Sequence, residues 1–171
     1  MQPNHVARAT LSPMRILQRL IGAMRRPMAE RHAKGKALTE LAAELKASGE
    51  ALDARFAQAP DSGANREALA HWIGIERWGQ RRLQVALGEP LVIDAYHGYR
   101  PDKEQGMAHL RDAFAQTRAD TLALIDRLQD AGVDPATTVR HNDLGDLSVA
   151  GWLAYLLQHP EQESKGRLRG A

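Results

Sequence analysis

The sequence predicts an all-α protein in which four long helices form a bundle. Four long stretches repeat apolar side chains at intervals of three and four residues, which is the period of a helix with one buried face. Only 5% of the 171 residues are aromatic, and β-branched runs are few, so an all-β sandwich is disfavoured. A chain of this length, with 43% hydrophobic residues, can form one compact domain with a core.

The four helices are expected at about residues 36–58, 65–87, 102–130 and 148–168. Residues that stop or cap helices lie at their ends, namely Pro60 and Gly63, Gly88, Gly132 and Pro135, and Ser148. Pro160 falls inside the last helix. Because proline lacks an amide hydrogen and disfavours helical geometry in the residue before it, a kink or local opening is expected there.

Two connections, at residues 89–101 and 132–147, are longer than a minimal bundle needs. Both are expected to be ordered loops that build the walls of a pocket. The stretch LVIDAY in the first loop has strand-forming residues, but no convincing second strand is present to pair with it.

Residues 1–28 are expected to form a basic extension that precedes a bundle domain at 29–171. They hold five of the 23 basic residues and no acidic one, which leaves 18 basic against 21 acidic side chains in the rest. A pI near 9.1 therefore does not indicate a nucleic-acid-binding domain. Ser12 and Pro13 are typical of the start of a short amphipathic helix. This segment could contact an anionic surface, pack on the bundle, or derive from an upstream start codon with Met28 as the true beginning.

The composition also excludes several classes of protein. The chain has no cysteine, so it forms no disulfide, offers no thiolate ligand and has no cysteine nucleophile. Its apolar stretches are shorter than the roughly 20 residues that span a bilayer. We therefore expect a cytoplasmic protein with neither a membrane nor a nucleic acid as its partner.

Two imidazoles and a carboxylate are candidate ligands for one divalent metal. His159 and Glu163 in LLQHPEQES are four residues apart, so they share a helix face, one turn apart. His71 lies in EALAHWIGIERW on the second predicted helix. Three protein ligands leave a position open for water or substrate, as catalytic metal sites do. A lone histidine at either position is more often a hydrogen-bonded core or boundary residue than a metal ligand.

Four motifs occur in the order HWIGIERW, DAYHGYRPD, RHNDLGDLS and GWLAYLLQHPEQES. In this order the chain resembles the DinB-like (DinB/YfiT) superfamily of metal-binding four-helix bundles over about residues 36–168. The resemblance implies a zinc or nickel ion on His71 and His159, with Glu163 where the family usually has a third histidine. It also implies a low-molecular-weight thiol cosubstrate, a small-molecule substrate, and a thiol-dependent S-transferase or hydrolase activity. The alternative is a non-catalytic, stress-associated binding or dimerisation module with a decayed metal site.

Polar and aromatic side chains near these motifs are expected to line the pocket: Tyr155, Tyr99, Arg100 and His141. Turn formation, helix capping, salt bridges and core packing are the competing roles for them. No residue is assigned a catalytic role. A P-loop, a GxSxG elbow and an HExxH pair are all missing from the sequence.

A homodimer is expected, because bundles of the resembled family often pair through a helix face. Trp72 and Trp78 are six residues apart on one predicted helix, so they point in different directions. One of the two is therefore expected at an interface.

Overall fold

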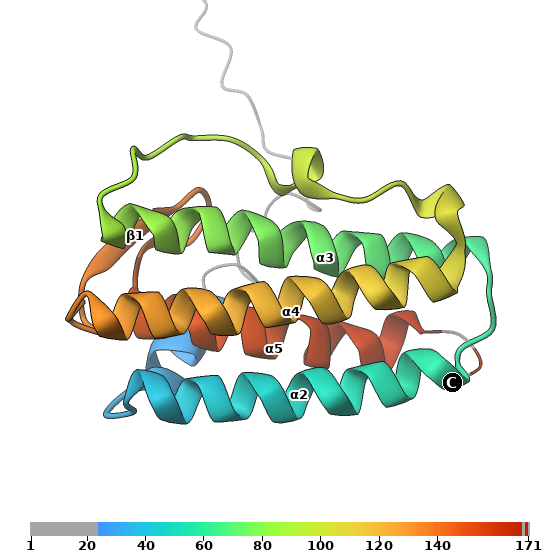
Figure 1. Cartoon of the computed structure of the whole chain (residues 1–171), viewed down its shortest axis with the longest axis horizontal. Coiled ribbons are helices and arrows are strands. Elements are labelled where there is room, and N and C mark those ends of the chain that lie inside the picture. Colours follow the sequence, from blue (N-terminus) through green and yellow to red (C-terminus); the bar gives the residue numbers. More distant parts are fainter. Residues whose placement is uncertain (1–23, 169, 171) are drawn as a thin grey trace, which may run out of the picture.

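Four long helices lie side by side in the computed structural model, which describes residues 24–168 and 170. They are α2 (Leu38–Gln58), α3 (Gly63–Leu83), α4 (Gly106–Asp130) and α5 (Val149–Arg167). Helices α2 and α3 each pack against both α4 and α5, and Figure 1 shows all four running along the long axis. The prediction of a mainly helical protein is confirmed. The helix predicted from Ser12 lies outside the described residues.

The helix ends follow from local chemistry. Helix α3 continues as a 3₁₀ turn, η1 (Gln84–Leu87), and stops at Gly88, whose φ of +97° favours glycine. Ser148 caps α5 by accepting a hydrogen bond from the backbone N–H of Gly151 at 2.8 Å. Helix α5 runs as one α-helix through Pro160, so of the two alternatives predicted there, a kink or a local opening, the local opening is wrong.

The loop at 132–147 contains an antiparallel hairpin, β1 (Thr138–His141) and β2 (Gly145–Ser148). It corrects the expectation of a strandless loop. Val139 pairs with Leu147 and both side chains are buried, as is Leu144 in the turn, so these apolar side chains anchor the hairpin to the core. In the other loop, η2 (Tyr96–Tyr99) and η3 (Lys103–Gln105) are short 3₁₀ turns, and the stretch LVIDAY forms no strand.

The helix over residues 24–33 is anchored to the start of α5. Ala29 and Ala33 on it are buried. Glu30 accepts hydrogen bonds of 2.8 Å from both the backbone N–H and the hydroxyl of Ser148. This helix runs across the boundary predicted between residues 28 and 29. None of the helices between residues 24 and 168 is both long and apolar enough to span a bilayer.

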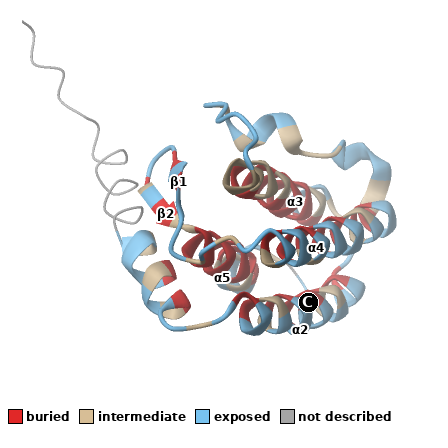
Figure 2. Ribbon diagram, turned by 60° about the vertical axis from the view of Figure 1, so that its left-hand side comes forward, coloured by how far each residue is buried: buried red, intermediate tan, exposed pale blue. Residues whose placement is uncertain are grey.

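Buried residues lie on the faces of the long helices that turn toward one another (Figure 2). Trp72 stacks on Phe56, with 5.7 Å between ring centroids, whereas Trp78 meets Trp152 edge-on at 5.3 Å. Trp72 is only 1% exposed and Trp78 only 3%, so the expectation that one of them lies at an interface is wrong. The homodimer stays a prediction.

Helices α3 and α5 approach each other closely at Gly79. A Cβ atom built there would lie 2.6 Å from Cδ2 of Leu156, whose side chain is itself buried. This approach sets the separation between α3 and α5 on which the candidate site depends.

We expect Gly79→Ala to lower the free energy of unfolding by about 1–3 kcal/mol, the usual cost of overpacking a core. Gly166→Ala is the matched control, because a Cβ there meets nothing within 4 Å and alanine favours the helix. Chemical denaturation of both variants measures the two effects. Equal stability of the two variants would contradict a tight contact at Gly79.

Candidate metal centre

His71 on α3 and His159 and Glu163 on α5 converge between the two helices. The two Nε2 atoms are 3.4 Å apart. Nε2 of His71 lies 3.4 Å from Oε2 of Glu163, and Nε2 of His159 lies 3.5 Å from Oε1. Both histidines are buried, with exposures of 8% and 5%. The structure therefore brings together three donors that the sequence places 88 and four residues apart.

The donor set fits a divalent metal by size. With the bond lengths of about 2.0–2.1 Å typical of zinc, neighbouring ligands of a tetrahedral site lie about 3.3 Å apart. The two Nε2 atoms are 3.4 Å apart, which is close to that spacing. Each Nε2 lies 3.4 or 3.5 Å from a different oxygen of Glu163, and one ligand atom from each of the three residues lies within 4.8 Å of the other two. Two imidazoles and one carboxylate are also an accepted set of nitrogen and oxygen ligands for zinc.

Continuity of α5 keeps two of these donors together. Because the helix does not open at Pro160, His159 and Glu163 remain one turn apart on the same face. Pro160 is itself buried, so the core packs around this part of the helix.

The charge states suit metal ligands. Burial lowers the pKa of His159 to about 3, with Glu163 opposing the shift, so its imidazole is neutral at pH 7. Burial opposes ionisation of Glu163, but the hydrogen bonds from His71 and Arg25 and the charge of Arg167 outweigh it and hold the pKa of the carboxyl well below its usual range. A neutral imidazole and an ionised carboxylate are the forms that bind metals.

Two arginines contact the far side of the imidazole rings. Nη1 of Arg25 lies 2.8 Å from Nδ1 of His159, and Nη2 of Arg100 lies 2.8 Å from Nδ1 of His71. A guanidinium group has donors and no acceptor, so each Nδ1 must accept. Each neutral ring then carries its hydrogen on Nε2, facing the carboxylate of Glu163.

Glu163 has further partners at the centre of the cluster. Nη2 of Arg25 donates to its Oε1 at 3.1 Å, and the indole N–H of Trp72 donates to its Oε2 at 3.3 Å. Nε of Arg167 lies 3.4 Å from the same Oε2. All described contacts of this carboxylate are therefore with cationic groups or N–H donors.

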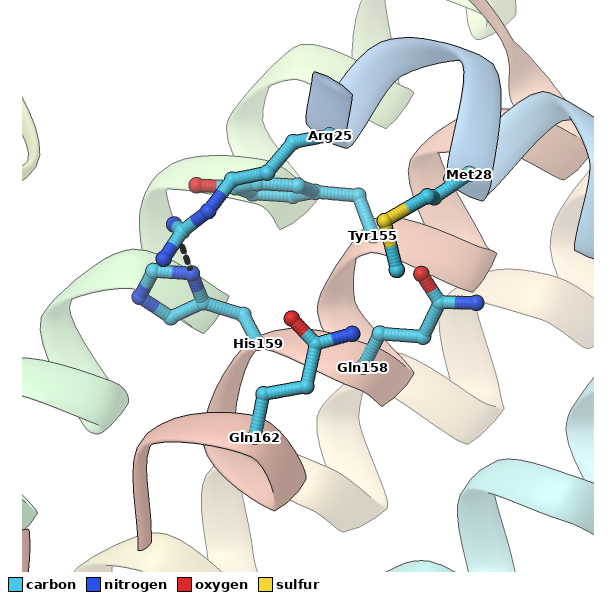
Figure 3. Close-up of a pocket in the computed structure, with 6 residues that line it drawn as sticks. All are labelled: Arg25, Met28, Tyr155, Gln158, His159 and Gln162. Atoms are coloured by element: carbon cyan, nitrogen blue, oxygen red, sulfur yellow. Dashed lines mark hydrogen bonds between the residues drawn. The ribbon is translucent and has the colours of Figure 1, made fainter. Parts of the chain in front are cut away.

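A small pocket opens beside His159, between the helix over residues 24–33 and α5 (Figure 3). Its lining residues are Arg25 and Met28 from the first helix, and Tyr155, Gln158, His159 and Gln162 from α5. Figure 3 shows the guanidinium group of Arg25 extending across this pocket to reach His159.

Known proteins give no further guide. Neither a family model, nor a curated protein, nor a solved structure matches this chain.

The four residues predicted to line the pocket lie in different surroundings. Tyr155 lines it, with its ring 5.3 Å from that of His159. Arg100 contacts His71 as described above. His141 packs against Tyr155, with 5.1 Å between the ring centroids. Its described contacts are with aromatic rings and with the backbone of the hairpin.

Tyr99 has no described contact with the three candidate ligands. Its hydroxyl donates to Oδ2 of Asp94 at 2.5 Å, so it ties the loop together. Tyr96, which was not predicted, takes the nearer position, with its ring edge-on to His71 at 5.1 Å. Arg25 was not predicted either, because it lies in the segment expected to be an extension that precedes the bundle domain.

Proposed function

We propose that this chain is a DinB-like four-helix-bundle enzyme that binds one divalent metal, zinc or nickel, through His71, His159 and Glu163. The proposed activity is a thiol-dependent S-transfer or a metal-dependent hydrolysis on a small-molecule substrate. The observation that supports it is the convergence of three buried or half-buried donors at separations that suit one metal.

Three protein ligands would leave at least one coordination position for a cosubstrate. When bound, such a metal supplies Lewis-acid chemistry, including the stabilisation of a thiol as its thiolate. The chain has no cysteine, so the thiol would come from a small cosubstrate. The small pocket beside His159 would be the point where such a molecule approaches, and Gln158 and Gln162 on its wall offer amides to orient it.

The arginines fit an anionic cosubstrate. Arg25, Arg100 and Arg167 surround a cluster whose nearby carboxylates are Glu163 and Glu67. A bound divalent cation would add to this positive charge. The surroundings would therefore attract a thiolate or a carboxylate.

A non-catalytic module of the same fold, acting in binding or dimerisation, is the second candidate. It is favoured by the hydrogen bonds from Arg25 and Arg100, which satisfy both histidines without a metal. In that case the cluster would be a structural remnant of a metal site.

Metal content separates the two candidates. We expect the purified protein to contain close to one zinc or nickel ion per chain by elemental analysis. Loss of a residue that only supports a metal ligand typically lowers the metal affinity by roughly 10–100-fold. Because His159 is a proposed ligand itself, His159→Ala should lower the zinc affinity by at least that factor. The matched control is His109→Ala, because His109 is exposed and lies on α4, away from the cluster.

A metal-free preparation that takes up neither zinc nor nickel would refute the enzyme and leave the non-catalytic module. Equal zinc affinity of His159→Ala and the wild-type chain would also refute the site, because zinc would then be bound elsewhere.

A further inference from the structure

Both histidines of the candidate metal centre have an unusual hydrogen-bond partner at Nδ1. A metal-bound imidazole almost always donates its second ring N–H to a carboxylate, a backbone carbonyl or a water molecule. Here, the partner of each Nδ1 atom is a guanidinium group at 2.8 Å, from Arg25 for His159 and from Arg100 for His71. These guanidinium groups can only donate.

Metal binding through Nε2 is incompatible with these contacts. An Nε2 atom that gives its lone pair to a metal cannot keep its hydrogen, so a neutral ring then carries that hydrogen on Nδ1. The Nδ1–H of His71 or His159 would point at an arginine N–H, with two donors facing each other across 2.8 Å. Turning the ring over gives no solution, since it puts a carbon atom where Nε2 was.

The two arginines come from independent parts of the chain, and each has anchors of its own. Nη1 of Arg100 donates to Glu67 at 2.9 Å, and its side chain crosses α3 where Gly74 has no Cβ to block it. A Cβ at Gly74 would lie 2.6 Å from Cγ of Arg100. Arg25 is anchored through Glu163 at 3.1 Å. The same arrangement, a guanidinium donor facing a histidine Nδ1, therefore occurs twice and involves two unrelated segments.

We propose that Arg25 and Arg100 are positioning residues that oppose metal loading, because they hold the hydrogens of His159 and His71 on Nε2 and must leave Nδ1 before a metal binds. This inference rests on the proposed metal site. It makes the helix over residues 24–33 and the loop around η2 parts of the metal-loading step.

Loading would change the partners of both arginines. Arg25 has a half-buried side chain, 29% exposed, that already lies in the pocket beside His159. Released from Nδ1, its guanidinium group is free to contact an anionic group in that pocket. Arg100 keeps Glu67 as a partner when it leaves His71.

Charge alone gives a competing explanation, since any cation near a metal weakens its binding. Arg167 is the matched control for this effect. Like the other two arginines it contacts a proposed ligand, at 3.4 Å from Glu163, but no contact with a histidine Nδ1 is described for it.

The test measures the zinc affinity of the full chain by competition with a chromophoric chelator, for the wild type, Arg25→Gln, Arg100→Gln, Arg25→Lys and Arg167→Gln. The amide oxygen of glutamine can accept from Nδ1–H, so each of the first two glutamine variants should bind zinc about tenfold more tightly or better. Arg25→Lys keeps both the charge and the donor, so it should stay near the wild type. Arg167→Gln should give a smaller gain than either.

Three results would overturn the inference: equal gains in all three glutamine variants, weaker binding in Arg25→Gln and Arg100→Gln, or no change in either. If the wild type binds zinc in those cases, the proposed function stands and only the role of the arginines falls. If no chain binds zinc, both fall. Circular dichroism checks that each variant folds. If the glutamine variant of one arginine does not fold, the glutamine variant of the other arginine is enough for the test.

Discussion

Replacing Glu76 by glutamine is expected to lower the free energy of unfolding by about 3–5 kcal/mol, the usual cost of breaking a buried ion pair. Glu76 is 2% exposed and Arg118 is 4% exposed. The guanidinium group makes a bidentate contact with the carboxylate at 2.7 and 2.9 Å, and Thr121 donates to the same carboxylate at 2.7 Å. Glutamine leaves the charge of Arg118 buried without a counterion and turns an amide N–H toward it.

The position of Arg118 makes relaxation difficult. It also donates to the backbone carbonyl of Leu45 at 2.7 Å, and its side chain crosses α2 at Gly49, where a Cβ would lie 3.0 Å from its Cγ. The arginine therefore links α2, α3 and α4. It cannot swing out to water without disturbing the packing of three helices.

Urea unfolding of Glu76→Gln measures the loss, with Glu50→Gln as the control. Glu50 pairs with Lys46 at 2.5 Å, but both side chains are about two-thirds exposed, so its loss should cost less than about 1 kcal/mol. The double variant Glu76→Leu with Arg118→Met should be more stable than the sum of the single losses predicts, because no charge remains buried. A loss below about 1 kcal/mol in Glu76→Gln would show that Arg118 finds another partner.

The helices could be predicted from the sequence because their signals are local. The spacing of apolar residues predicted the four long helices. Gly88 and Ser148 predicted the end of the second and the start of the fourth, and the structure agrees within a few residues. The pairing of His159 with Glu163 was predictable for the same reason. Both lie on one helix, so their relative position depends only on the helical period.

What the sequence could not give depends on contacts between distant segments. Arg25 reaches its two partners across 134 and 138 residues, and nothing near it in the sequence marks that contact. The hairpin was missed because its strands have only four residues each, too few for a clear alternation of apolar and polar side chains.

The two tryptophans of α3 show the same limit. Their spacing does point the rings in different directions, as expected. Both are nevertheless buried, because α3 packs against α4 and α5, and η2 covers another part of its surface. Spacing tells how side chains are distributed around a helix, but only the tertiary arrangement tells which directions are covered.

Acid is expected to destabilise the fold between pH 6.5 and 4 through His141. Its imidazole is 5% exposed, stacks on Trp152 at 5.0 Å and meets Trp78 edge-on at 4.9 Å. Its Nδ1 accepts from the backbone N–H groups of Asp143 and Leu144 at 3.1 and 3.2 Å, which fixes the hairpin turn. A proton on Nδ1 would break both hydrogen bonds.

Burial, assisted by the charge of Arg82, lowers the pKa of His141 from 6.5 to about 4. Above pH 6.5 the ring is neutral in both the folded and the unfolded chain, so it contributes no pH dependence. As the pH falls below 6.5, the unfolded chain binds a proton and the folded chain does not, so stability decreases until the pH reaches about 4. At about 1.4 kcal/mol per unit of pKa difference, the total loss is about 3 kcal/mol. The buried His159 acts in the same direction, so the wild-type slope contains both contributions.

His141→Gln isolates the contribution of His141, because it removes this titration and leaves His159 in place. Denaturant unfolding of both chains at several values between pH 7 and pH 4 gives the two slopes. We expect the variant to be less stable at pH 7, since the turn loses its imidazole acceptor, yet to lose less stability on acidification than the wild type. Parallel slopes would mean that the folded chain protonates His141 as readily as the unfolded one, and that its burial does not resist the charge.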